Sequence, residues 1–166
     1  MSLILNKATF QSSLATLPLV SYQAGETVIA DGSRTGRLLI LSKGTVAIVK
    51  EGTEIAKVAE PGAVFGELSV LLDQPHAADV RAMEASEFHV ADASTLLTQN
   101  PVAVLYVATM LAQRLNGANH ALIQLKHQLL TGEPPNVVAK TVSKMEGFLI
   151  ASASLMYAGY PNDPYA

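Results

Sequence analysis

The stretch FGELSVLLDQPHAADVRA, Phe65 to Ala82, carries the pattern on which the fold prediction rests. Gly66 permits a close approach of the backbone, and ELSVLL after it suits one short helix. Free N–H groups at a helix start favour an anion, and Glu67 at this place is suited to accept hydrogen bonds from sugar hydroxyls. An FGE tripeptide alone is weak support, because many turns before helices read this way. The interpretation therefore depends on the sequence around it.

Short strand-like runs separated by glycine turns surround this stretch. The strand-like runs are RLLIL (37–41), TVAIV (45–49), EIAKVA (54–59) and SEFHVAD (86–92). Between such runs lie AGE, DGS, KG, EG and EPG, which are typical turn sequences. Many short strands at these intervals predict a closed β architecture, either a sandwich or a barrel.

Helical patterns flank the β region on both sides. Residues 1–20 carry Phe10, Leu14 and Leu17 at helical spacing, and 132–166 predict a C-terminal helix and tail. The C-terminal helix is expected to start at Asn136. Its apolar face would contain Val138, Val142, Met145, Leu149 and Met156, and Gly159-Tyr160-Pro161 would end it.

A long helix is predicted from Asn100-Pro101 to about Leu130. Apolar residues repeat along it with alternating spacings of three and four, at Ala108, Leu111, Leu115, Ala118, Leu122, Leu125 and Leu129. This pattern fits either a helix lying on the barrel or the seam of a two-stranded coil. Because the seam is narrow and regular, a homodimer through residues 101–130 is favoured.

Composition excludes several classes of function. The 166 residues are 49% hydrophobic and 15% charged with a net charge of −3, which is typical of a globular chain and not of a general nucleic-acid binder. The absence of cysteine removes disulfides and thiol catalysis, and fits cytoplasmic residence. The most apolar late stretch, 147–158, is too short for a membrane span. No membrane association is expected.

Glycine turns and the FGEL block occur in a fixed order from Tyr22 to Ala82, and this order resembles the cyclic-nucleotide-binding domain family over about residues 10–130. The chain is most similar to the sensor half of bacterial regulators of the cyclic-AMP receptor and fumarate/nitrate-reduction type, without their DNA-binding domain. The resemblance implies a mainly β fold, an eight-stranded β-roll with flanking helices, followed by a long dimerisation-type helix and a short C-terminal helix. It divides the chain into an N-terminal helical segment (1–20), the β-roll (21–92), capping and dimerisation helices (93–131) and residues 132–166.

The same resemblance identifies residues 65–78 as a phosphate-binding cassette. It implies that Gly66 is the cassette glycine, that Glu67 binds ribose, and that Leu68 and Ser69 extend a helix whose backbone faces the phosphate. Phe65 opens the cassette. Ala78 matches the small residue beside the ligand, and Asn119 on the long helix is either a partner for the base edge or a solvated residue.

The sequence departs from the family pattern after the cassette helix. Where the family has Pro-Arg-Ser/Thr-Ala, this chain reads Pro75-His76-Ala77-Ala78. Arginine offers a permanent charge and a planar fork, whereas histidine is mostly neutral at pH 7. The loss of such a charge-assisted pair costs about 2–4 kcal/mol, or roughly thirtyfold to a thousandfold in affinity. Arg34 and Arg37, in the DGSRTGR turn, are better candidates to compensate for it than Arg81, which would face the opposite way on its strand.

Two functions remain open on the sequence. One is a regulatory module that senses cyclic AMP, cyclic GMP or a related small anion and signals through its dimer helix. The other is a degenerate, nucleotide-free domain that serves dimerisation or partner binding. No enzyme, metal site or cofactor is expected, because His76, His89, His120 and His127 form no ligand pair and no serine elbow occurs. DNA binding by this chain alone is not expected, since its C-terminal segment is short and carries few cations.

Overall fold

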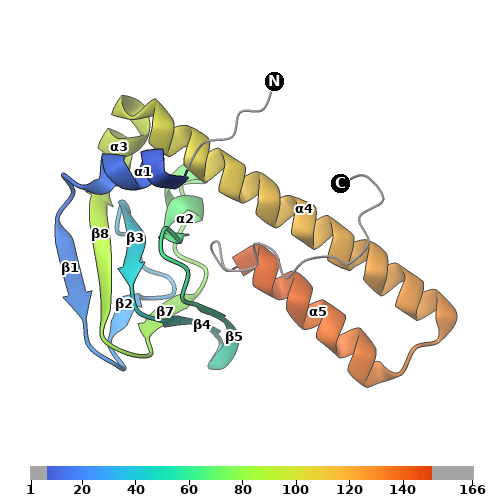
Figure 1. Cartoon of the computed structure of the whole chain (residues 1–166). Helices are drawn as coiled ribbons and strands as arrows, with labels where there is room; N and C mark the ends of the chain where they lie inside the picture. The colour runs from blue at the N-terminus through green and yellow to red at the C-terminus, as the bar shows by residue number, and fades with distance from the viewer. Residues whose placement is uncertain (1–6, 151–166) are drawn as a thin grey trace.

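Within the part of the chain that the structure describes, eight strands pair into two four-stranded antiparallel sheets that form a β-roll (Figure 1). The computed structural model describes residues 7–150. One sheet has the order β1-β8-β3-β6, and the other has the order β2-β7-β4-β5. The strands are β1 (Leu19–Tyr22), β2 (Thr27–Ile29), β3 (Arg37–Lys43), β4 (Val46–Lys50), β5 (Thr53–Val58), β6 (Val64–Phe65), β7 (Asp79–Ala82) and β8 (Ser86–Asp92). This architecture confirms the predicted fold class.

The central strand β3 lies in the hydrophobic core of the roll. Leu38, Leu39, Ile40 and Leu41 are all buried, and such a run is typical of a strand covered on both faces. The same core cluster includes Phe10 of α1 (Lys7–Leu14) and Met110 of the long helix α4 (Pro101–Thr131). The N-terminal helix and the first half of α4 therefore share one hydrophobic core with the sheets.

The helices begin and end at residues that the sequence marks. Asp92 caps α3 (Ala93–Gln99) by accepting a hydrogen bond from the Thr95 amide, and Asn100 caps α4 through the Ala103 amide. Gly132 ends α4 in the left-handed conformation, at φ 71°. The C-terminal helix α5 (Pro135–Ile150) starts one residue before the predicted Asn136. Met156 and residues 159–161, also assigned to this helix or its end, lie outside the described residues.

Helices α4 and α5 form an antiparallel hairpin (Figure 1). α4 crosses the roll and extends beyond it, and α5 folds back beside α4 until its end approaches the short helix α2 (Glu67–Leu71). Within residues 7–150, no single helix is long and apolar enough to cross a membrane. α3 and α4 pass that test only as a pair, and they are bent by 104°.

The long helix has two apolar stripes, whereas the sequence predicts one seam. An inner stripe is buried and comprises Ala103, Val107, Met110, Arg114, Ala118, Ala121 and Gln128. The outer stripe contains Leu115, Leu122 and Leu129, which are 60%, 53% and 64% exposed. Ala118, assigned to the predicted seam, belongs to the inner stripe. The exposed leucines are spaced by seven residues, which is the period of a coiled-coil contact.

Candidate functional site

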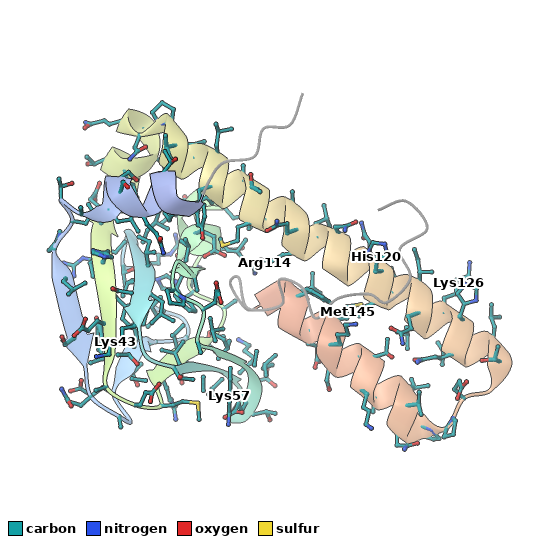
Figure 2. The ribbon with its side chains drawn as sticks, viewed as in Figure 1. Lys43, Lys57, Arg114, His120, Lys126 and Met145 are labelled. Atoms are coloured by element: carbon teal, nitrogen blue, oxygen red, sulfur yellow. The ribbon has the colours of Figure 1, made fainter. Side chains whose placement is uncertain are left out.

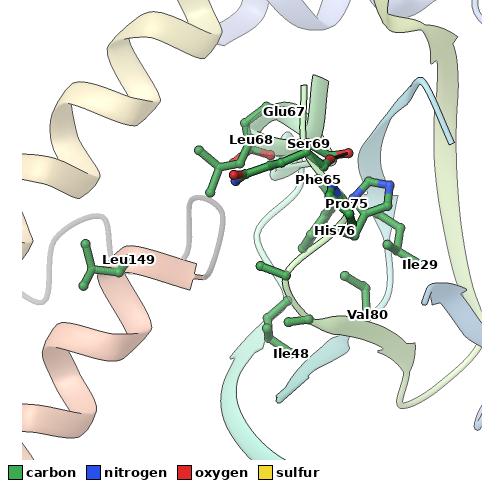
Figure 3. Close-up of a pocket in the computed structure, with 14 residues that line it drawn as sticks. Ile29, Ile48, Phe65, Glu67, Leu68, Ser69, Pro75, His76, Val80 and Leu149 are labelled. Carbon is green, nitrogen blue, oxygen red and sulfur yellow. Dashed lines mark hydrogen bonds between the residues drawn. The ribbon is translucent and has the colours of Figure 1, made fainter. Parts of the chain in front are cut away.

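The cassette residues line a pocket at one end of the β-roll (Figure 3). The pocket is open to solvent, and its empty space together with that opening is about 550 Å³. Eight residues that the sequence nominates lie together in its wall: Phe65, Gly66, Glu67, Leu68, Ser69, His76, Ala77 and Ala78. Asn119 is exposed on α4 and is not among the lining residues.

Gly66 allows the cassette to turn tightly against β3. It precedes α2 with φ 93°, a conformation that residues with side chains rarely adopt. A Cβ atom at this position would lie 2.5 Å from the Arg37 carbonyl oxygen and 3.4 Å from Cε1 of His76. The wall of the pocket is therefore built around a missing side chain, with the His76 ring against it.

The short helix α2 is held in place by its own side chains. The Ser69 hydroxyl donates a hydrogen bond of 2.6 Å to the Gln74 carbonyl, which ties α2 to the loop that follows. Ser69 is buried, so this bond satisfies a hydroxyl that water does not reach. Below α2 the floor of the pocket is apolar, formed by Ile29, Ile48 and Val80 (Figure 3).

Glu67 is a buried acid, with 3% of its surface exposed. Its carboxylate accepts a charge-assisted hydrogen bond from Nη1 of Arg114 on α4, and the two side chains form a buried ion pair. Burial raises the pKa of Glu67, and the Arg114 guanidinium opposes that rise. Among residues 7–150 this carboxylate is the one acidic group that lines the wall, and Arg114 compensates its charge.

The same guanidinium also holds the end of α5. Nε of Arg114 donates to the Phe148 carbonyl at 3.0 Å, and Nη2 donates to the Leu149 carbonyl at 2.7 Å. These carbonyls belong to the last turn of α5, where carbonyl groups lack partners within the helix. Arg114 lies between the β-roll and the end of α5 (Figure 2). One side chain of α4 thus joins the cassette to the C-terminal helix.

His76 replaces the expected arginine without supplying its charge. The ring is buried, and Nε2 lies 3.0 Å from the hydroxyl of Thr35. Burial lowers the pKa of His76, so the neutral ring predominates at pH 7. The lining residues include no lysine or arginine. A phosphate at this wall would meet no fixed positive charge.

The two arginines considered as substitutes have other positions. Arg34 forms an ion pair of 2.9 Å with Asp73, and both side chains are exposed. Arg37 is exposed and does not line the pocket. Asp79 accepts hydrogen bonds from Arg81 and from the Asp31 amide, which lower its pKa. Neither arginine compensates for His76 in this arrangement.

Sequence reasoning missed two contributors to the site. Leu149 of α5 lines the pocket, and no local motif places a residue so far along the chain at the cassette. Arg114 had a usable signal: it lies on the apolar stripe that runs through Met110 and Ala118. A charged residue on a buried helical face is seldom left unpaired, so a buried acid was to be expected opposite it.

Comparisons with known proteins agree with this geometry. Residues 19–99 match the family model described as the cyclic nucleotide-binding domain. The chain is 40% identical over 67 residues to an uncharacterized ABC transporter ATP-binding protein of Mycobacterium tuberculosis, covering 38% of this chain and 20% of that protein. It is 30% identical over 101 residues to a cGMP-dependent protein kinase of Caenorhabditis briggsae, covering 61% of this chain and 12% of the kinase. The chain therefore spans about a fifth of the first relative and less of the second.

Solved structures share the fold. The catabolite activator protein of Thermus thermophilus superposes with a TM-score of 0.57 at 21% identity, covering 89% of this chain and 81% of that one. A cyclic nucleotide-binding domain from Methylobacillus flagellatus gives a TM-score of 0.55 at 23% identity, covering 64% and 65%. At these identities the likeness concerns the fold alone.

Proposed function

We propose, from the match of residues 19–99 to the cyclic nucleotide-binding domain model, that this chain is a regulatory module that binds a cyclic nucleotide or a related small anion. The ligand would occupy the cassette pocket, with its sugar hydroxyls near Glu67 and its base over the apolar floor. The observation that carries the proposal is the position of Arg114, which touches both the pocket acid and α5. A change at Glu67 is thereby linked to the helices that leave the β-roll.

The phosphate end of such a ligand would be held weakly at pH 7. Backbone N–H groups at the start of α2 and the His76 ring are the groups available to it. Neither is a fixed charge, and the buried ring gains a proton only at an additional cost. Low affinity for cyclic nucleotides, rising as His76 is protonated, is the expected behaviour.

Signalling would pass through a homodimer formed by α4. Leu115, Leu122 and Leu129 form an exposed apolar stripe on the side of the helix that neither α5 nor the roll covers. In a two-fold symmetric dimer, the same stripe of a second copy would pack against these leucines and bury them. In this proposal the chain carries out no catalytic step, and DNA binding is not assigned to it.

A degenerate, nucleotide-free domain is the second candidate. It is favoured by the absence of lysine and arginine from the lining residues and by the ion pair that already satisfies Glu67. In that case the roll would be a scaffold for dimerisation or for a partner protein. The α4 stripe would then be the functional surface.

Calorimetry with cyclic AMP and cyclic GMP separates the two candidates. The wild-type chain is titrated beside His76→Arg, with His127→Arg, on the exposed surface of α4, as a control that adds the same charge elsewhere. Binding by the wild type supports the sensor, and a gain of roughly thirtyfold or more in His76→Arg identifies the missing charge as the weak point. Binding by His76→Arg alone supports the degenerate domain. Absence of binding by both proteins contradicts a nucleotide site.

A further inference from the structure

The loop between β2 and β3 holds His76 by its backbone. The His76 amide donates a hydrogen bond of 2.8 Å to the Ser33 carbonyl, and the His76 carbonyl accepts one of 2.8 Å from the Gly32 amide. Residues 32–35 of this loop do not line the pocket, whereas His76 does, on the side opposite Leu149 (Figure 3). The place of His76 in the wall is therefore set by contacts from outside the pocket.

The same loop also contacts the His76 ring, through Thr35. Nε2 of the ring lies 3.0 Å from the Thr35 hydroxyl oxygen, and that oxygen accepts a hydrogen bond of 3.3 Å from the Arg37 amide. The ring also packs against Gly66, because its Cε1 atom lies 3.4 Å from where a Cβ atom of that residue would be. The orientation of the ring is thus fixed by Thr35 and by the absence of a side chain at Gly66.

The contacts of the Thr35 hydroxyl bear on which ring nitrogen carries a proton. A hydroxyl has one proton to donate, and its oxygen already accepts from the Arg37 amide. The nitrogen beside it, Nε2 of His76, can take that proton as a hydrogen-bond acceptor. Burial lowers the pKa of His76, so the ring is neutral at pH 7 and carries a single proton. These contacts favour a ring in which Nε2 accepts and Nδ1 carries the proton.

Nδ1 is the ring nitrogen that a bound molecule can reach. Nε2 is engaged by Thr35, and no hydrogen bond within residues 7–150 engages Nδ1. In the same part of the chain, the buried side-chain nitrogen and oxygen atoms without a partner are Nδ1 of His89 and Oε1 of Gln128. Because Nδ1 of His76 is not one of them, it is accessible to solvent. An N–H group on this atom is therefore available to a ligand.

We infer that Thr35 is a positioning residue that fixes His76 as its Nδ1–H tautomer, so that the pocket wall presents one aimed, uncharged N–H donor in place of the expected arginine. Such a donor serves a phosphate oxygen and an uncharged oxygen alike, so a ligand needs no negative charge to make this contact. The inference rests on the proposed function only as far as the ligand is concerned. The tautomer of His76 stands without it.

Nitrogen NMR of protein labelled in its histidine rings, recorded at pH 7.5 without ligand, tests the tautomer. The protonated and unprotonated nitrogens of a neutral ring differ widely in chemical shift, and His76→Gln identifies the signals of His76. We expect the Nδ1–H form in the wild type. Thr35→Val removes the hydroxyl and keeps the branched shape, so the ratio of the two tautomers should move about fivefold toward Nε2–H, the effect of one typical hydrogen bond.

Two further variants control this measurement. Thr35→Ser keeps the hydroxyl and should keep the wild-type signals of His76. Thr53→Val makes the same substitution at an exposed position of β5 that does not line the pocket, and it should also leave these signals unchanged. An Nε2–H ring in the wild type, or an equal tautomer ratio in the wild type and Thr35→Val, overturns the inference.

Calorimetric titration with cyclic AMP at pH 7.5 tests the contact with a ligand. Loss of the aimed donor should weaken binding about threefold to tenfold in Thr35→Val, while Thr35→Ser and Thr53→Val should match the wild type. Equal affinities of the wild type and Thr35→Val overturn the role of the ring donor in binding. If the wild type binds neither cyclic AMP nor cyclic GMP, the proposed function fails, and the NMR signals decide the tautomer independently.

Discussion

Arg114 on α4 and Glu67 on α2 form a buried ion pair, and Arg114 extends it to the backbone of α5. Burying two charges costs more than their attraction returns unless the remaining hydrogen-bonding groups are satisfied. The α5 carbonyls meet that condition for the guanidinium. Arg114 therefore links the cassette, the long helix α4 and the C-terminal helix α5 through one set of buried polar contacts.

Arg114→Gln is expected to lower the free energy of unfolding by about 3–5 kcal/mol at pH 7, because it leaves the Glu67 charge buried without a partner. Burial already raises the pKa of Glu67 above its ordinary value of 4.5, and loss of Arg114 raises it further. A carboxyl with a raised pKa in the folded state destabilises the fold as the pH rises through that pKa. Urea unfolding at pH 4.5 and pH 7.5 should therefore show the larger loss at pH 7.5.

A double variant, Arg114→Gln with Glu67→Gln, is the control for this prediction. It removes both charges and keeps groups of similar size, so much of the pH-dependent loss should disappear. If Arg114→Gln lowers the free energy of unfolding equally at pH 4.5 and pH 7.5, the destabilisation comes from the lost hydrogen bonds to α5 and not from the buried Glu67 charge.

His76 makes stability depend on pH in the opposite direction. Burial lowers its pKa from 6.5 in the folded chain, so the unfolded chain takes up the proton first as the pH falls. Stability is complete above pH 6.5 and is lost as the pH falls through the folded-state pKa. Between pH 7.5 and pH 5.5 the melting temperature of His76→Gln should fall less steeply than that of the wild type. The glutamine side chain does not titrate, but it can still form a hydrogen bond with Thr35. Identical slopes for the two proteins would contradict this role of His76.

Binding of cyclic AMP should strengthen between pH 8 and pH 6, against the trend in stability. A bound phosphate stabilises the protonated ring, so binding takes up a proton when His76 faces the ligand. Calorimetry in two buffers of different ionisation enthalpy measures that proton uptake. His76→Gln should show no uptake, and uptake that persists in this variant would point to another group.

The sequence predicted the parts of this site that are local in the chain. Phe65 to Ala78 is one continuous stretch, so its turn glycine, its acid and its short helix could be recognised together. The long helix was also predictable, because Asn100 and Gly132 mark its ends. Four of the eight strands were not found from local pattern, and β6 illustrates why: a strand of two residues has no period to detect.

The parts of the site that the sequence did not predict depend on contacts between residues that are far apart in the chain. Arg114 and Glu67 are separated by 47 positions, and Arg114 and Leu149 by 35. The heptad spacing of apolar residues in α4 does not distinguish the stripe that faces α5 from the stripe that faces solvent. That separation requires the position of α5, which follows from packing such as that of Phe148 on Gly117.

Substitution of Gly66 tests whether the cassette requires a residue without a side chain at this position. Gly66→Ala combines a left-handed φ of 93° with a Cβ 2.5 Å from the Arg37 carbonyl oxygen. Gly52→Ala is the matched control, because its φ is 76° and nothing lies within 4 Å of the added atom. In both variants alanine must adopt a positive φ, which costs about 1 kcal/mol. Only in Gly66→Ala must the backbone around the Arg37 carbonyl also shift. We expect a clearly lower melting temperature for Gly66→Ala than for Gly52→Ala, and equal values would contradict the packing described for the cassette.

Leu122→Glu tests the proposed dimer on the exposed stripe of α4. Leu122 is 53% exposed, so the substitution should leave the free energy of unfolding of a monomer within about 0.5 kcal/mol of the wild type. In a two-fold dimer each substitution appears twice across one seam, and the like charges meet where leucines packed before. Light scattering after gel filtration should then show the wild type as a dimer and the variant as a monomer. Leu149→Glu places the same change outside the stripe and should remain dimeric. A wild-type chain that is monomeric at high micromolar concentration would rule out signalling through an α4 dimer, and the hairpin of α4 and α5 would be left as the route from the pocket.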